Sequence, residues 1–150
     1  MSLVVHWMTD DGERRAFLAT HAASIRVSAE MPLRANLSAL DNIAVIPQYQ
    51  ANLSYEAAAD LAWSLLLRAG RTDMAFKRDP DLTHAERFVA KLLRAMIGRP
   101  GLVVIDRPAM QLPDIHYPPF LDTLLERFAD TLNDCWIVDY RWNAPLYPNR

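Results

Sequence analysis

The sequence predicts an α/β fold built on a parallel sheet with flanking helices. Two short segments, 102–106 and 135–139, each place four consecutive apolar residues before an aspartate, a pattern typical of strands buried on both faces. Between them, apolar residues at helical spacing over 118–132 predict a helix, so the three segments form a strand-helix-strand unit. Ligands of such sheets bind at the carboxyl ends of the strands, here near Asp106 and Asp139.

Two further helices are predicted upstream of this unit. Ser54 is a candidate N-cap, and apolar residues then recur at helical spacing until Gly70 ends the helix. Thr83 and Glu86 have the spacing of a capping box, and the helix that follows them ends at Gly98. The charged segment between the two helices predicts a loop.

The first third of the chain gives weaker patterns. Segments 3–7 and 25–27 predict short strands, with a polar turn over 10–12 and a short helix over 14–23. The sequence contains no internal repeat and no Gly/Ser linker, so we predict a single domain over residues 1–150.

Composition excludes several classes of protein. With 51% hydrophobic residues in 150, the chain can bury a core without disulfides or a structural metal. Sixteen Lys and Arg against eighteen Asp and Glu provide no basic field for a nucleic acid. The lone cysteine, Cys135, predicts a reducing compartment and a packing role, and no apolar run approaches the length of a membrane helix. We therefore expect a cytoplasmic protein.

The 150 residues contain only four glycines, which excludes glycine-rich nucleotide loops from this sequence. A phosphate-binding GxxxxGK[ST] loop needs a lysine directly after a glycine, and neither Lys77 nor Lys91 follows one. The four histidines, His6, His21, His84 and His116, show no metal-ligand spacing. We therefore predict no metal and no cofactor.

The stretch LTHAERFVAKLLRAMIGRPGLVVIDRP, residues 82–108, resembles the ATP-binding subunit of ABC transporters, in particular those of bacterial lipid-trafficking systems. Its layout follows the family's signature motif, the helix after it and the Walker B strand. Upstream, ANLSALDNIAVIPQY, residues 35–49, is similar to the segment that follows the family's Q-loop and lies near the transmembrane partner. The resemblance covers 25–145 and leaves 1–24 as a divergent N-terminal segment. It implies a partial P-loop-NTPase-like sheet core flanked by helices.

The resemblance assigns vestigial motif positions to this chain. They are Leu82, Thr83, His84, Ala85 and Glu86 for the signature motif, Asp106 and Arg107 for Walker B, and Tyr140 for the switch histidine. The same comparison marks a possible partner-coupling surface at Asn36, Leu37, Leu40, Asp41 and Asn42.

Departures from the family pattern remove its chemistry. The phosphate-binding loop and the strand before it are expected to be missing, and Ala29 with Glu30 stands where the Q-loop glutamine belongs. Arg107 replaces the catalytic glutamate and cannot act as a general base. The resemblance thus implies a truncated, degenerate subunit in which ATP hydrolysis by this chain alone is not expected.

Two kinds of function follow from these observations. The first is a non-catalytic accessory or regulatory subunit that binds a transporter ATPase or permease and meets the membrane only through that partner. The second is a small α/β enzyme using Asp106, Asp139 and His116 as acid and base groups. A decayed ATPase without a retained role is a third reading of the same pattern.

Simpler structural roles compete with each functional one. Asp106 can be a strand-terminal acid that accepts hydrogen bonds from nearby backbone amides, and Arg107 can pair with Asp106 or Asp114. Thr83 and Glu86 are fully explained by the capping box.

Overall fold

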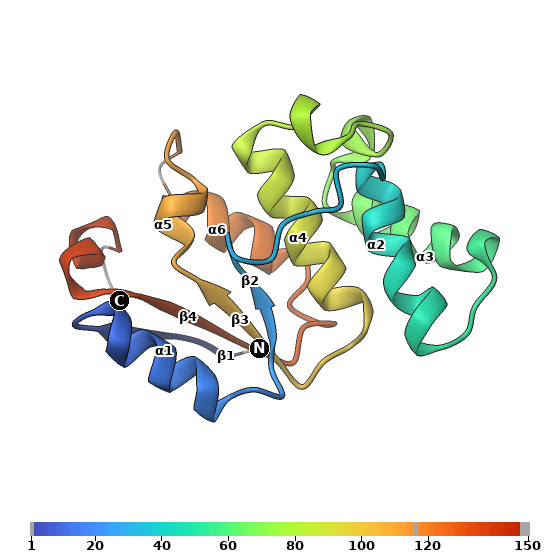
Figure 1. Cartoon of the computed structure of the whole chain (residues 1–150). Helices are drawn as coiled ribbons and strands as arrows, with labels where there is room; N and C mark the ends of the chain where they lie inside the picture. Colours follow the sequence, from blue (N-terminus) through green and yellow to red (C-terminus); the bar gives the residue numbers. More distant parts are fainter. Residues whose placement is uncertain (1, 116, 148–150) are drawn as a thin grey trace. The chain divides into compact units, whose positions relative to one another are not determined.

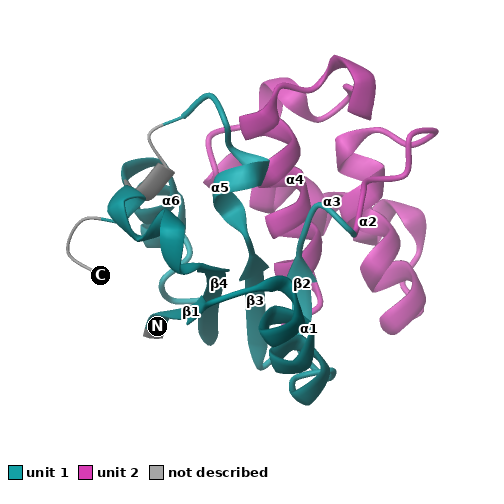
Figure 2. Cartoon of the chain, turned by 60° about the vertical axis from the view of Figure 1, so that its left-hand side comes forward, with its two compact units in different colours: residues 1–30, 100–150 teal, residues 31–99 magenta. Residues whose placement is uncertain are grey.

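A computed structural model of the chain describes residues 2–115 and 117–147, and it divides into two compact units. Unit 1 comprises residues 1–30 and 100–150, and unit 2 comprises residues 31–99 (Figure 2). That the chain forms a single domain over residues 1–150 stays a prediction.

Unit 1 is built on a parallel four-stranded sheet (Figure 1). The strands are β1 (Ser2–Met8), β2 (Ile25–Val27), β3 (Leu102–Asp106) and β4 (Asp134–Tyr140). Their order is β1-β4-β3-β2, and every neighbouring pair is parallel. The predicted α/β class with a parallel sheet is confirmed.

Helix α1 (Asp11–Thr20) lies on one face of this sheet. Its Leu18 forms a buried cluster with Met8, Val104 and Val138 of three strands. Asp10 is the N-cap and accepts a hydrogen bond from the Glu13 amide, so the helix begins where we predicted a polar turn. The polar turn is therefore shorter than the predicted 10–12, because Asp10 caps a helix that already starts at Asp11.

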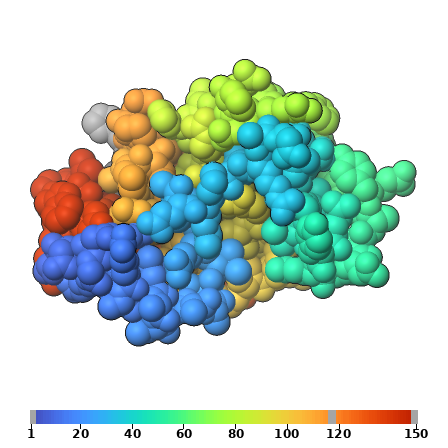
Figure 3. Space-filling model, viewed as in Figure 1, coloured from blue at the N-terminus to red at the C-terminus, as the bar shows by residue number. Residues whose placement is uncertain are grey.

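The strand-helix-strand unit from β3 to β4 contains two helices, α5 (Pro108–Gln111) and α6 (Tyr117–Glu126). We expected one helix reaching residue 132, but it ends at Glu126. Phe128 and Leu132 are nevertheless buried, because turns after the helix carry them into the core. After β4 the chain forms a 3-10 helix, η3 (Arg141–Leu146), and in Figure 3 this C-terminal part lies beside the N-terminal part.

Unit 2 is helical. It contains α2 (Ala39–Gln50), α3 (Tyr55–Arg68) and α4 (His84–Ile97), with 3-10 turns η1 (Thr72–Met74) and η2 (Asp79–Asp81) inside the segment predicted as a loop. Ser54 caps α3 as predicted, and Gly70 follows that helix with a φ of 69°, a value that favours glycine. In the part of the chain that the structure describes, no helix has the length and apolar character that crossing a bilayer requires.

Candidate functional site

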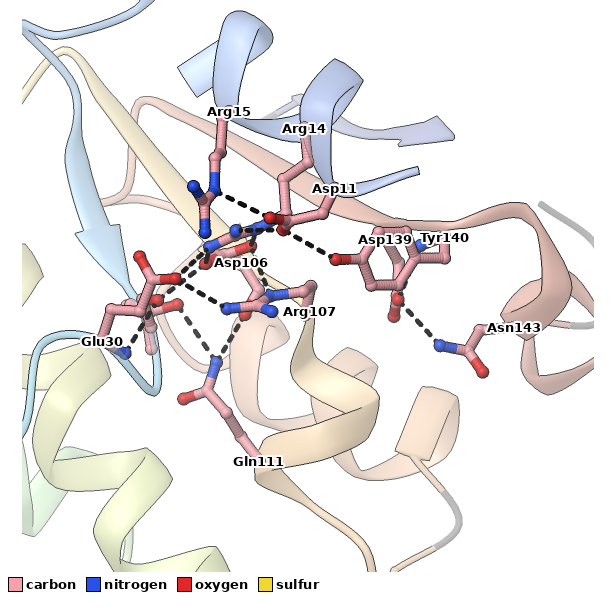
Figure 4. Close-up of polar contacts among 12 residues, drawn as sticks. Asp11, Arg14, Arg15, Glu30, Asp106, Arg107, Gln111, Asp139, Tyr140 and Asn143 are labelled. Carbon is pink, nitrogen blue, oxygen red and sulfur yellow. Dashed lines mark hydrogen bonds and ion pairs between the residues drawn. The ribbon is translucent and has the colours of Figure 1, made fainter. Parts of the chain in front are cut away.

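The carboxylate of Asp106 stands at the end of β3 and is bound by an arginine from α1 (Figure 4). Arg14 Nε donates to Asp106 Oδ1 at 2.8 Å, and Arg14 Nη2 donates to Oδ2 at 2.6 Å. The two side chains are 1% and 0% exposed. The pair is therefore a bidentate ion pair shielded from solvent, the geometry in which guanidinium and carboxylate interact most strongly.

Two further side chains complete the shell around Asp106. Ser28 Oγ donates to Oδ2 at 2.7 Å, and Arg107 Nε approaches Oδ1 at 3.3 Å. Burial alone raises the pKa of Asp106, but hydrogen bonds from Arg14 and Ser28 and the charges of Arg107 and Arg14 outweigh it, so the pKa lies below its ordinary value. The predicted role of Asp106 as an acceptor for backbone amides was wrong, because these side chains take its oxygens.

Arg14 is itself surrounded by carboxylates. Besides Asp106, it binds Asp11 through Nη1 at 2.9 Å and Glu30 through Nη2 at 3.0 Å. Its hydrogen bond to Asp106 raises the already high pKa of this guanidinium further, despite the opposing effect of burial. Arg14 is therefore a permanent buried cation, neutralised within unit 1.

Arg107 has a left-handed backbone, with φ of 48° and ψ of 60°. For a residue other than glycine this conformation costs roughly 1–2 kcal/mol. Its amide donates to the Val138 carbonyl at 2.7 Å, and its side chain binds Glu30 at 3.2 Å as well as Asp106. The predicted ion pair with Asp106 is confirmed, and these contacts hold the strained conformation in place.

Asp139 belongs to a separate cluster. Its oxygens accept hydrogen bonds from the Tyr140 amide at 2.8 Å, Asn143 Nδ2 at 2.9 Å and the Tyr147 hydroxyl at 2.6 Å. The bonds from Asn143 and Tyr147 therefore hold the segment after β4 against the end of that strand. Tyr140, at the vestigial switch position, donates to Asp11 Oδ1 at 3.0 Å and stacks on Trp142.

The sheet register places Asp106 and Asp139 on opposite faces. Asp106 is the partner of Val138, and partners in a parallel pair point to the same face, so Asp139, one residue later, points to the other. The two aspartates lie at the carboxyl ends of neighbouring strands, as predicted, but they cannot share one substrate as an acid-base pair. His116, the third member of that hypothesis, lies outside the described residues.

In unit 2 the signature-like segment forms the start of α4. Thr83 Oγ1 accepts from the Glu86 amide at 3.1 Å, and Glu86 Oε1 accepts from the Thr83 amide at 3.0 Å. The capping box is thus confirmed. His84 and Ala85 are the first two residues of the helix, Leu82 before them is buried, and Lys77 binds Glu86 at 3.1 Å.

The possible coupling surface is only partly a surface. Asn36 is exposed, and Leu37 and Asp41 are half-buried, but Leu40 is 7% exposed and Asn42 is 1% exposed. The side-chain amide of Asn42 accepts a hydrogen bond from the Arg34 backbone amide and donates to the backbone carbonyls of Arg34, Leu37 and Ser38. These bonds close the turn before α2. The placement of Leu40 and Asn42 in the surface was therefore wrong, because both serve the interior.

Comparisons with known proteins agree with this architecture. No protein-family model matches the chain. The chain is 29% identical over 101 residues to the lipoprotein-releasing system ATP-binding protein LolD of Bacteroides thetaiotaomicron; the match covers 67% of the chain and 45% of that protein. The chain thus spans less than half of this relative.

Solved ABC structures share the fold. The dimeric post-hydrolysis structure of the ATP-binding cassette MJ0796, bound to ADP and phosphate, matches with a TM-score of 0.62 and 22% identity, over 89% of this chain and 58% of that one. An ABC transporter in an inward-facing conformation matches with a TM-score of 0.69 and 15% identity, over 93% and 64%. The fold is therefore like that of an ABC cassette, and the chain is similar in sequence and architecture to ATP-binding subunits of ABC transporters.

This fold clarifies the role of β1 and α1. P-loop proteins place the phosphate loop between a strand and a helix, and the loop's Ser or Thr shares a magnesium ion with the Walker B aspartate. Here β1 and α1 form such a strand-turn-helix unit, and Arg14 of α1 contacts Asp106. Asp10 and Asp11 lie at the turn between this strand and this helix, and the expectation that the phosphate-binding loop and the strand before it are missing stays a prediction.

The residues around Asp106 do not fit a magnesium ion. Mg²⁺ requires six oxygen ligands in near-octahedral geometry, and a carboxylate binds it through oxygens that are free to approach. Both oxygens of Asp106 are bound to Arg14, and Ser28 and Arg107 add further donors. Sequence reasoning missed Arg14, Asp11 and Ser28, although the polar run TDDGERR directly after an apolar strand indicated an unusual turn.

Proposed function

We propose that the chain is a non-catalytic ABC-ATPase-like subunit, a pseudo-ATPase that acts by protein-protein binding to a transporter ATPase or permease. The observation that carries this proposal is that Arg14, Ser28 and Arg107 all bind the Asp106 carboxylate. The Arg14 guanidinium binds both oxygens of this carboxylate, which a magnesium ion would need as ligands. The arginine at the position of the catalytic glutamate adds a second fixed positive charge and no base.

The comparisons support the partner class. The relative in Bacteroides carries the name of a lipoprotein-releasing ATP-binding protein, and the matched structures are ABC cassettes and a transporter. We therefore propose an ABC transporter of lipid-trafficking type as the partner, with the chain in the cytoplasm, peripheral to the inner face of the membrane. Asn36 and the exposed parts of Leu37 and Asp41 remain the proposed contact region.

Isothermal titration of the purified chain with ATP and Mg²⁺ tests the non-catalytic part of the proposal. We expect no saturable heat below 1 mM nucleotide, on the order of the upper end of the KM range of ordinary enzymes. Saturable, magnesium-dependent binding in that range, abolished by Asp106→Asn, would refute it.

Capture from native membranes tests the binding part. The tagged chain should recover an ABC permease together with a complete ATPase, identified by mass spectrometry. Asn36→Arg should reduce that recovery, whereas Asp73→Arg, a charge reversal at another exposed site in unit 2, should leave it unchanged. Equal recovery with both variants would contradict the proposed contact region, and absence of both proteins from the wild-type capture would contradict the partner class.

A further inference from the structure

Four rings from three elements form a cluster under α1. His6 of β1 lies 4.9 Å from Phe17 of α1 and 4.7 Å from Trp136 of β4, measured between ring centroids. His21, which caps α1, lies 4.7 Å from Phe17 and 4.9 Å from Trp136. Two imidazoles thus flank the same two aromatic side chains. Together with the Leu18 cluster, these rings hold the C-terminal half of α1 on β1 and β4.

His6 is poorly placed to carry a charge in this cluster. Its Nε2 atom is buried and has no hydrogen-bond partner among the residues that the structure describes. An imidazolium needs an acceptor at both nitrogens, and an isolated charge in an apolar setting is costly. Burial and the neighbouring charge of His21 both lower the pKa of His6. The docked position of α1 therefore favours neutral His6.

The charged groups on the surrounding elements do not offer compensation. In β1, His6 is the only titratable side chain. On α1, the charged residues lie in the first half of the helix and are bonded at the other end of the sheet, and on β2 the guanidinium of Arg26 binds the Leu18 carbonyl. On β4, Asp139 faces the opposite side of the sheet and Asp134 is exposed at the start of the strand.

Helix α1 also carries Arg14, the cation that is bound to Asp106. Arg14 stands two helical turns before His21, so any separation of α1 from the sheet removes both contacts together. We propose that protonation of His6 releases α1 from β1 and β4 and thereby uncovers Asp106, making α1 an acid-sensitive latch. The latch does not depend on the proposed function, because it rests on contacts within unit 1.

Linkage fixes the direction and size of the effect. In the released state His6 is solvated and has its ordinary pKa of 6.5, whereas docking lowers that pKa. Release therefore takes up one proton between pH 6.5 and the docked pKa. Within that window the equilibrium constant for release rises up to about tenfold for each unit by which pH falls. Above pH 6.5 the equilibrium does not depend on His6.

Hydrogen exchange of the full chain tests this latch. Amide exchange in α1, corrected for the intrinsic pH dependence, should give an opening constant at pH 5.5 above that at pH 6.5, by at most about fivefold. Amides of α4 in unit 2 should show no such rise. His6→Gln should abolish the slope in α1, whereas His84→Gln, at the exposed start of α4, should retain it.

An α1 opening constant that is independent of pH, or a slope that persists in His6→Gln, would overturn the proposal. If His6→Gln does not fold, the wild-type imidazole signals decide instead. An NMR titration midpoint for His6 below pH 6.5 is expected, and a midpoint at or above it would overturn the proposal.

Discussion

Replacing Arg14 by methionine should destabilise unit 1 strongly. The change leaves the Asp106 side chain, which is 0% exposed, with Ser28 and the more distant Arg107 as partners. Removing one member of a buried ion pair costs about 3–5 kcal/mol because the other charge stays buried. Since Arg107 still offers a positive charge at 3.3 Å, we expect the lower end, about 3 kcal/mol.

Urea unfolding followed by tryptophan fluorescence measures this loss. Trp63 is in unit 2 and the other three tryptophans are in unit 1, so a Trp63→Phe background reports on unit 1 alone. With a slope of about 2 kcal/mol per M, a loss of about 3 kcal/mol lowers the urea midpoint by about 1.5 M. Arg15→Met is the matched control, because Arg15 is 75% exposed and its pair with Asp11 should contribute less than about 1 kcal/mol.

A double-mutant cycle separates the ion pair from general disruption. Adding Asp106→Asn to Arg14→Met removes the stranded charge, so the double variant should be more stable than the sum of the single losses predicts, by about 2 kcal/mol. If Arg14→Met and Arg15→Met shift the midpoint equally, or if the two single losses simply add, the buried pair does not have the role assigned to it.

Three further outcomes follow from the structure. Thr83→Ala removes the N-cap of α4 and should cost unit 2 about 1 kcal/mol, measured by Trp63 fluorescence in urea; an unchanged midpoint would argue against the capping box. Burial raises the pKa of the Cys135 thiol to about 12, so at pH 8 its thiolate fraction should be about a thousandfold below that of a free thiol, and labelling by iodoacetamide should require unfolding. Folding lowers the pKa of Asp106, so the stability that its carboxylate confers is fully present above the unfolded pKa near 3.8 and is lost as pH falls through the folded pKa. Asp106→Asn should lack this acid-induced loss of stability. If the wild type and the variant lose stability identically with acid, the carboxylate does not have this role.

Local features of the fold were predictable from sequence because short-range chemistry determines them. The capping box at Thr83, the stop at Gly70 and the buried strand ending at Asp106 each depend on residues within one helical turn or one strand. Helix α2 was not predicted, although Ser38 caps it through the Asp41 amide. Its apolar run and its internal Pro47 obscure the helical period, and tertiary burial overrides both.

The centre of the site could not be predicted for a different reason. Arg14 and Asp106 are 92 residues apart, and nothing in either local segment specifies their pairing. The left-handed backbone of Arg107 is equally invisible in sequence, since an arginine in that position normally adopts a helical or extended conformation. The sheet order brings these residues together, and no local pattern in the sequence specifies that order.

The strand order also dictates when the two units can form during synthesis. Unit 2 is one continuous segment, so all of its residues are available for contacts with one another as soon as residue 99 has left the ribosome. Strand β1 must wait longer, because it pairs with β4, and Ser2 meets Asp134 only after residue 134 has been made. A nascent chain halted before β4 would therefore hold β1 without its partner strand, and an unpaired apolar strand favours aggregation and binding by chaperones.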